Sequence, residues 1–200
     1  MSLLYEPAID FNEEEHIYKV EGIEVPSVTT ILQDAGFRKN MAFFTQAGSN
    51  RGTYIHKLTE QLDEGCMDWG QVGEYLPYLE AYIQFKEDYG LEILLREGKM
   101  FNRAMWYAGT VDIIGHVKGD EIPAVIDIKT GQPDKATDLQ LILYGGMVKW
   151  QTPAEELPLR TACLYLKKTG KYKYVPTIER DDYKAAAFGA VHCYHFRRGL

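Results

Sequence analysis

Cysteine is scarce in this sequence of 200 residues, which contains Cys66, Cys163 and Cys193. The three lie far apart and are odd in number, and no Cys-x-x-Cys pair occurs. The sequence therefore indicates neither a disulfide framework nor a four-cysteine metal site. His192 and His195 flank Cys193, but closely spaced His and Cys near an aromatic-rich terminus are more often packing residues than zinc ligands. We expect no zinc site there.

Long apolar runs and an excess of positive charge are also missing. No window approaches the ~18 consecutive apolar residues of a membrane span, and residues 1–6 lack the features of a secretory signal. We therefore expect a cytoplasmic, intracellular protein without a membrane partner. The net charge of -7 argues against a protein that coats nucleic acid along its whole surface. It does not exclude a nuclease, because divalent cations held by carboxylates themselves attract a polyanion.

The sequence lacks the signature motifs of several other enzyme classes and any sign of subdivision. There is no GxxxxGK[ST], no GxGxxG and no GxSxG. Hydrophobic residues make up 46% of the chain and the mean hydropathy is -0.30, values typical of a globular protein. No repeat, low-complexity tract or Ser/Pro-rich linker occurs, so we expect one domain over residues 1–200.

Hydrophobic periodicity predicts the elements of this domain. Residues 1–26 should contain a hairpin that pairs 15–20 with 22–26. Within a helical region over residues 27–90, helices are expected at 28–36, 40–47, 52–64 and 71–89, with a break at 48–50 and Ser27 as the first N-cap. Residues 91–200 should form the sheet core and a C-terminal helix, with strands at 91–101, 106–117, 122–130, 160–167 and 172–177 and helices at 134–149 and 180–196. This order predicts an α/β (α+β) domain whose mixed central sheet is flanked by helices.

Two consecutive expected strands carry charged residues among apolar ones. Asp127 and Lys129 share one face, whereas Ile126 and Ile128 point the other way. If the strands pair through the intervening turn, Asp112 converges on Asp127. Two carboxylates and an ammonium inside an apolar sheet are costly unless they are paired or hold a cation, and a hard divalent metal satisfies them. An ordinary ion pair at a strand end is the alternative.

Three further positions add polar groups to this pattern. Glu97 stands where strand alternation calls for an apolar residue. His56 and Glu60 are four apart on one helix face, which can orient the imidazole toward a metal. Gln140 and Tyr144 are also four apart, in an apolar helix. A buried glutamine needs hydrogen-bond partners, which an active-site carboxylate or a substrate phosphate could supply.

Taken in chain order, these residues resemble the PD-(D/E)XK nuclease superfamily, whose fold is restriction-endonuclease-like. Within it they are similar to the RecB-like branch, which includes CRISPR adaptation nucleases, phage exonucleases and the mitochondrial genome-maintenance exonuclease. The resemblance spans about residues 26–150. The Asp-x-Lys element alone is nonspecific, so the ordered set carries the resemblance. The matching segments are Pro26–Leu32, Arg51–Thr53 with His56 and Glu60, Gly109–Asp112, Ile126–Gly131, and Gln140 with Tyr144.

The resemblance implies a site for Mg²⁺ or Mn²⁺. The ligands that it implies are His56, Asp112, Asp127 and the backbone carbonyl of Ile128. Lys129 would orient the attacking water or stabilise charge on the phosphate. The other catalytic residues that it implies are Glu97 as a secondary acid, and Gln140 and Tyr144 as positioning groups. Many relatives bind an iron–sulfur cluster through four cysteines, which this chain cannot supply, so no iron–sulfur cluster is expected.

The resulting functional prediction is a metal-dependent DNA exonuclease that leaves 5′-phosphates in recombination, repair or replication, with any protein partner unknown. A structure-specific or nicking endonuclease on the same fold is an alternative, and so is a catalytically inactive nucleic-acid-binding module. The exonuclease is favoured because the helix with His56 looks most like end-processing relatives. Candidate DNA contacts, for which a solvated hairpin tip is an equal alternative, are Arg51, Lys167, Lys168, Lys171 and Lys173.

His116 provides a negative prediction. It shares a strand face with Asp112 but lies four residues further on, about 13 Å away at ~3.3 Å per residue. We therefore expect that it does not bind the same ion.

Overall fold

The structure, a computed structural model, describes residues 7–12, 15, 17–38, 46–152 and 158–199. Its strands are β1 (Ile9–Asn12), β2 (Ile17–Val20), β3 (Ile23–Val25), β4 (Glu92–Asn102), β5 (Tyr107–His116), β6 (Ala124–Lys129), β7 (Arg160–Leu166) and β8 (Tyr172–Pro176). Its helices are α1 (Val28–Asp34), α2 (Gln46–Asp63), α3 (Leu76–Tyr89), α4 (Lys135–Gln151) and α5 (Asp181–Arg198), with short 3-10 turns η2 (Trp69–Gln71) and η3 (Gly73–Tyr75).

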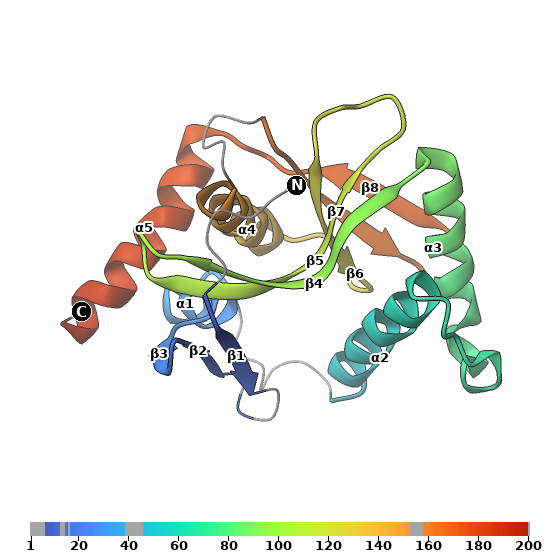
Figure 1. Cartoon of the computed structure of the whole chain (residues 1–200), viewed down its shortest axis with the longest axis horizontal. Coiled ribbons are helices and arrows are strands. Elements are labelled where there is room, and N and C mark those ends of the chain that lie inside the picture. The colour runs from blue at the N-terminus through green and yellow to red at the C-terminus, as the bar shows by residue number, and fades with distance from the viewer. Residues whose placement is uncertain (1–6, 13–14, 16, 39–45, 153–157, 200) are drawn as a thin grey trace.

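A five-stranded mixed sheet in the order β4-β5-β6-β7-β8 forms the centre of the molecule (Figure 1). β6 and β7 are parallel and are connected through α4, whereas the other neighbouring strands run antiparallel. A smaller antiparallel sheet, β1-β2-β3, packs on β4 and β5 through Tyr18, Val20 and Val25 against Phe101 and Ala108. The prediction of an α/β (α+β) domain with a mixed central sheet and flanking helices is confirmed.

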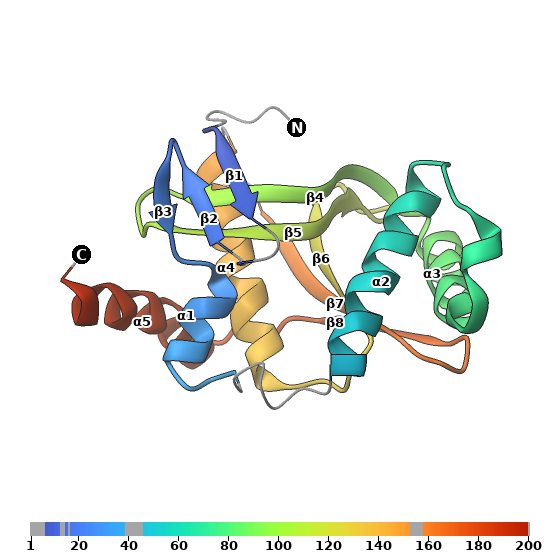
Figure 2. The same ribbon diagram turned by 90° about the horizontal axis from the view of Figure 1, so that it is seen from below.

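Helices cover both sides of the sheet. Figures 1 and 2 show α1, α4 and α5 on one side and α2 and α3 on the other. In β6, Val125 packs in the cluster that contains α4, whereas Ile126 and Ile128 pack in the cluster that contains α3. Because side chains alternate along a strand, Asp127 and Lys129 face the α4 side. The expected division of this strand is confirmed.

The N-terminal elements differ from the prediction at two places. β1 was not predicted, yet it pairs with β2 from Ile9–Val20 to Asn12–Ile17. The predicted break at 48–50 is wrong, because α2 is continuous from Gln46 to Asp63. Low helix propensity at a few positions is outweighed when a long helix buries an apolar face, here with Ile55 and Leu58. Most of the helix predicted at 40–47 lies outside the described residues.

The region before α3 also differs. The predicted helix at 71–89 begins as an α-helix at Leu76, because residues 69–75 form the 3-10 turns η2 and η3. Pro77 stands in the first turn of α3, where its missing N–H costs no helical hydrogen bond. Gly90 ends α3 in the left-handed conformation. Within the described part of the chain, no helix is long and apolar enough to span a membrane.

Candidate metal centre

The candidate metal centre lies beside the point where β5 and β6 stop pairing. The antiparallel ladder between them ends at Ile113 and Ile126, so the next residues, Asp112 and Asp127, lie where the strands diverge. One carboxylate oxygen of Asp112, Oδ2, accepts the backbone N–H of Ile128 at 2.6 Å. Both aspartates are buried, with 6% and 1% of their surface exposed. Strand divergence thus gives Asp112 a backbone donor that a regular ladder would have used for pairing.

Helix α2 brings His56 to the same point from the other side of the sheet. Its Nε2 lies 2.9 Å from the carbonyl oxygen of Ile128. Its Nδ1 lies 3.5 Å from Asp112 Oδ2 and 3.8 Å from Glu97 Oε1. The potential ligand atoms of His56, Glu97 and Asp112 all lie within 4.8 Å of one another. Residues from α2, β4 and β5 therefore converge beside the Ile128 carbonyl.

Asp127 is held by residues on the α4 side. Lys129 Nζ lies 2.9 Å from Asp127 Oδ1 and 2.6 Å from Oδ2. Gln140, buried in α4, donates from Nε2 to Asp127 Oδ1 at 3.3 Å and to the hydroxyl of Tyr144 at 2.7 Å. Of the two positioning groups that the resemblance implies, Gln140 thus contacts the Asp127 carboxylate directly, and Tyr144 contacts Gln140.

Electrostatics set the protonation of these groups. Burial works to lower the pKa of His56, but the negative charges of Asp112 and of the nearby Glu97 outweigh it, so the pKa is raised. Burial raises the pKa of Asp127, and the ammonium of Lys129 opposes that effect. Burial works to lower the pKa of Lys129, but Asp127 and Asp112 raise it overall. Lys129 is therefore a cation at neutral pH, and burial also keeps the Tyr144 hydroxyl protonated by raising its pKa.

Glu97 reaches this group in an unexpected way. Regular strand alternation was predicted, but β4 has a register shift between Ile93 and Leu95, and Glu97 has a φ of 46°. That left-handed conformation is uncommon for residues other than glycine. The prediction of regular alternation in this strand is wrong. The bulge and the positive φ of Glu97, rather than simple alternation, determine where its side chain points.

The donor set fits a hard divalent cation. Glu97 Oε1 is buried and accepts no hydrogen bond, and Asp127 Oδ2 has the ion contact with Lys129 but no hydrogen bond of regular geometry. Buried carboxylate oxygens without partners are costly. Carboxylates, a backbone carbonyl and an imidazole are donors that Mg²⁺ and Mn²⁺ accept. The residues that could hold the ion are His56, Glu97 and Asp112, whose ligand atoms converge, with the Ile128 carbonyl. Asp127, which the resemblance also implies as a ligand, is not in this converging group.

Two arginines at the centre were missed by the sequence reasoning. Arg96 of β4 donates to Thr59 Oγ1, to the carbonyl of His56 at 3.4 Å and to the carbonyl of Asp112 at 3.5 Å, which fastens α2 to β5. Arg38, which follows α1, donates from Nη1 to Gln140 Oε1 at 3.3 Å. Neither arginine stands in a motif, and Arg38 lies 102 residues from Gln140, so no local pattern could have found them.

The candidate DNA contacts lie in two places. Arg51 is on α2 and its Nε is buried without a hydrogen-bond partner. The lysines surround the β7–β8 turn, where Lys167 Nζ donates to the Gly131 carbonyl at 3.5 Å while Lys168 and Lys171 are exposed. Lys173 pairs with Tyr165, which pairs with Lys129. Aligned residues of neighbouring strands share a face, so Lys173 lies on the Lys129 side of the sheet.

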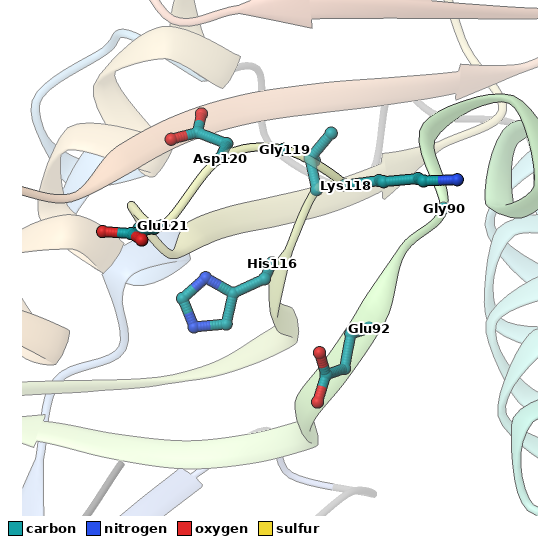
Figure 3. A pocket seen from close by; sticks show the side chains of 8 residues that line it. Gly90, Glu92, His116, Lys118, Gly119, Asp120 and Glu121 are labelled. Carbon is teal, nitrogen blue, oxygen red and sulfur yellow. The ribbon is translucent and has the colours of Figure 1, made fainter.

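His116 lies away from this centre, at the far end of β5. It pairs with Glu92, and its ring points into a separate cavity of about 420 Å³ (Figure 3). The residues that line this cavity are Gly90, Glu92, His116, Val117, Lys118, Gly119, Asp120 and Glu121. Within the described residues, the group of converging metal ligands does not include His116. One of the two histidines in the last helix, His195, contacts the carbonyl of Met105 at 3.0 Å.

Comparisons with known proteins leave the family open. No family model matches the chain, and no curated protein matches it. Among solved structures, one described as "Crystal structure of SSO0001" is 14% identical and covers 83% of this chain and 84% of its own, with a TM-score of 0.31. A TM-score this low carries no argument about function.

Proposed function

We propose that this protein is a metal-dependent nuclease of the RecB-like PD-(D/E)XK type that hydrolyses DNA phosphodiester bonds. The observation that carries the proposal is the arrangement described above. His56, Glu97 and Asp112 converge beside the Ile128 carbonyl, and the preceding residue, Asp127, pairs with Lys129. A simple ion pair between Asp127 and Lys129 would need neither the imidazole nor the second aspartate. It would also leave the buried Glu97 oxygen unexplained.

Each residue then has a defined part in the chemistry. His56, Glu97, Asp112, Asp127 and the Ile128 carbonyl would hold Mg²⁺ or Mn²⁺, which supplies a water of lowered pKa and neutralises charge on the phosphate. Lys129, kept protonated by Asp127, places a fixed positive charge beside the ion. Electrostatic groups of this kind stabilise the negative charge that develops on phosphoryl oxygens. Gln140 fixes the orientation of Asp127, because it donates to the same oxygen as Lys129.

Within this function, we propose exonuclease action on DNA with a free end, in the cytoplasm, during recombination, repair or replication. The exonuclease part rests on the resemblance of the segments around Arg51 and His56 to end-processing nucleases. A structure-specific or nicking endonuclease would use the same chemistry, so substrate topology separates the two. Linear DNA labelled at either end and a covalently closed circle of the same sequence, each single- and double-stranded, are incubated with Mg²⁺ or Mn²⁺. Shortening of the linear DNA with an intact circle supports the exonuclease, whereas cleavage of the circle supports the endonuclease.

The first prediction concerns Asp127→Asn, which removes the charge and keeps the shape. We expect the rate of cleavage to fall at least about 100-fold, because the ion and Lys129 lose their shared partner. Asp120→Asn is the matched control, since Asp120 pairs with Arg160 beside the separate cavity. Equal rates for wild type and Asp127→Asn, or binding without turnover in either metal, would contradict the proposal and favour an inactive binding module.

A further inference from the structure

Arg38 extends from the end of α1 to the metal centre. Its backbone N–H donates to the carbonyl of Leu32 at 3.1 Å, which fixes the chain where the helix ends. Its guanidinium donates twice from Nη1, to Thr29 Oγ1 and to Gln140 Oε1, each at 3.3 Å. Gln140 in turn contacts Asp127. The arginine is therefore one side chain removed from the carboxylate at the centre.

The charge of Arg38 has no counter-ion among the described residues. Both of its hydrogen-bond partners are neutral oxygens, although its side chain is half-buried. The acid nearest to it in sequence, Asp34, is already paired with Arg197 and Arg198, and residues 39–45 contain no acid. By contrast, Lys129 is paired with Asp127. A partly buried cation held by neutral groups alone is costly unless an anion completes the site.

Like charge nearby strengthens this requirement. Arg38 and Lys129 are both linked to Asp127, Lys129 directly and Arg38 through Gln140. Two cations on one side of the centre repel each other in the protein alone and both attract an anion that lies between or beside them. The guanidinium also has N–H groups to spare: Nε and Nη2 make no hydrogen bond to the described residues. These donors form a planar fork that matches two oxygens of a phosphate.

We propose that Arg38 binds a backbone phosphate of the nucleic acid beside the metal centre, through Nε and Nη2, while Nη1 stays anchored to Thr29 and Gln140. This inference rests on the proposed function, because it takes nucleic acid as the substrate. The contact forms when the substrate binds and persists in the transition state. Loss of Arg38 therefore weakens binding and raises KM more than it lowers kcat.

The test compares Arg38→Gln and Arg38→Lys with wild type in two assays. In Mg²⁺, we expect Arg38→Gln to raise KM about tenfold and to change kcat less than about threefold. Binding of a fluorescent oligonucleotide is measured by anisotropy in Ca²⁺ over a range of salt concentrations, with the DNA checked for integrity. The binding constant falls as salt rises, so the slope of log K against log[salt] is negative. Removing one phosphate contact makes this slope less steep, by about 0.7 for single strands and about 0.9 for duplex. Arg38→Lys keeps the charge without the fork, so we expect the slope to recover while the affinity recovers in part.

Controls separate phosphate binding from a structural role. Arg160→Gln is the control, because Arg160 is the first residue of β7 and pairs with Asp120 beside the separate cavity. We expect the salt slope of this variant to equal that of wild type. The Tm of Arg38→Gln, measured by thermal unfolding, should equal that of wild type or be slightly higher, because a cation without a counter-ion is removed. A large loss of stability, or a fall in kcat with unchanged KM and unchanged salt slope, would show that Arg38 acts by holding Gln140 and would overturn the inference.

The two proposals fail in distinguishable ways. If the wild type binds the oligonucleotide with an Arg38-dependent salt slope but cleaves no DNA in Mg²⁺ or Mn²⁺, the nuclease proposal fails and the phosphate contact stands. If the wild type cleaves DNA and Arg38→Gln has wild-type KM and salt slope, the contact fails and the nuclease stands. If the wild type binds no nucleic acid, both are wrong.

Discussion

Among single residues, Glu97 combines backbone strain with an unsatisfied side chain. Its φ of 46° is left-handed, a conformation that costs roughly 1–3 kcal/mol for residues other than glycine. Its Oε1 is buried without a hydrogen bond and lies 3.8 Å from His56 Nδ1. Neither property stabilises the fold. Both are explained if the strain is tolerated because it aims a carboxylate at a cation.

Two substitutions of Glu97 test this explanation. We expect Glu97→Gly to raise the free energy of unfolding without metal by about 1 kcal/mol, because glycine relieves the strain. Glu97→Gln should keep the strain, and both variants should bind Mn²⁺ about tenfold more weakly. Thermal unfolding over a range of Mn²⁺ concentrations measures both quantities, since a ligand of the folded state raises Tm. If the Tm of both variants rises with Mn²⁺ concentration as it does in wild type, Glu97 is not a ligand of the ion.

At the scale of elements, the site depends on how α2 is attached to the sheet. Arg96 lies at this attachment, with hydrogen bonds to Thr59, the His56 carbonyl and the Asp112 carbonyl. Its Nε also lies 3.4 Å from Asp63 Oδ2, near the end of α2. One arginine of β4 thus fixes the helix that presents the imidazole to the strand that presents the aspartate.

We expect Arg96→Gln to destabilise the protein and to reduce its activity together. The free energy of unfolding should fall by about 2 kcal/mol, because hydrogen bonds to a largely buried guanidinium are lost. Denaturant unfolding measures this value. Lys86→Gln is the matched control: Lys86 pairs with the same Asp63 but is 30% exposed, and its loss should cost less than about 1 kcal/mol. Normal cleavage by a destabilised Arg96→Gln would show that the position of His56 does not depend on this contact.

At the scale of the whole molecule, the end of α5 closes onto the end of α1. Arg197 and Arg198 each lie 2.9 Å from a carboxylate oxygen of Asp34, more than 160 residues away in sequence. α1 and α5 both pack against α4 in one core cluster. The ion pairs join the ends of α1 and α5, and α5 buries Ala187, Ala190 and Val191.

These ion pairs predict a dependence of stability on pH. The hydrogen bond from Arg198, with the charges of both arginines, holds the pKa of Asp34 below its usual value. Since the folded pKa is the lower one, the contribution of Asp34 is fully present above its unfolded pKa of about 4 and is lost as pH falls through the folded pKa. The difference in unfolding free energy between wild type and Asp34→Asn should therefore be largest near neutral pH and shrink below pH ~4. High salt should reduce it, and a difference that is independent of pH would contradict this account.

The sequence determined the elements and the chemical character of the site. Alternation in β6 placed Asp127 and Lys129 opposite Ile126 and Ile128, because the side-chain period of a strand is fixed by its backbone. The order of helices and strands determined the mixed α+β architecture. The spacing of Gln140 and Tyr144 also indicated that the two would meet, because residues four apart share a helix face.

Tertiary structure alone decided which distant groups meet and in what geometry. The divergence of β5 from β6 gave Asp112 the N–H of Ile128, and the bulge in β4 aimed Glu97 at His56. The positions of Arg38 and Arg96 followed from how α1 and α2 pack on the sheet. Such contacts join segments far apart in the chain, so they depend on packing and on backbone irregularities that no local sequence period encodes.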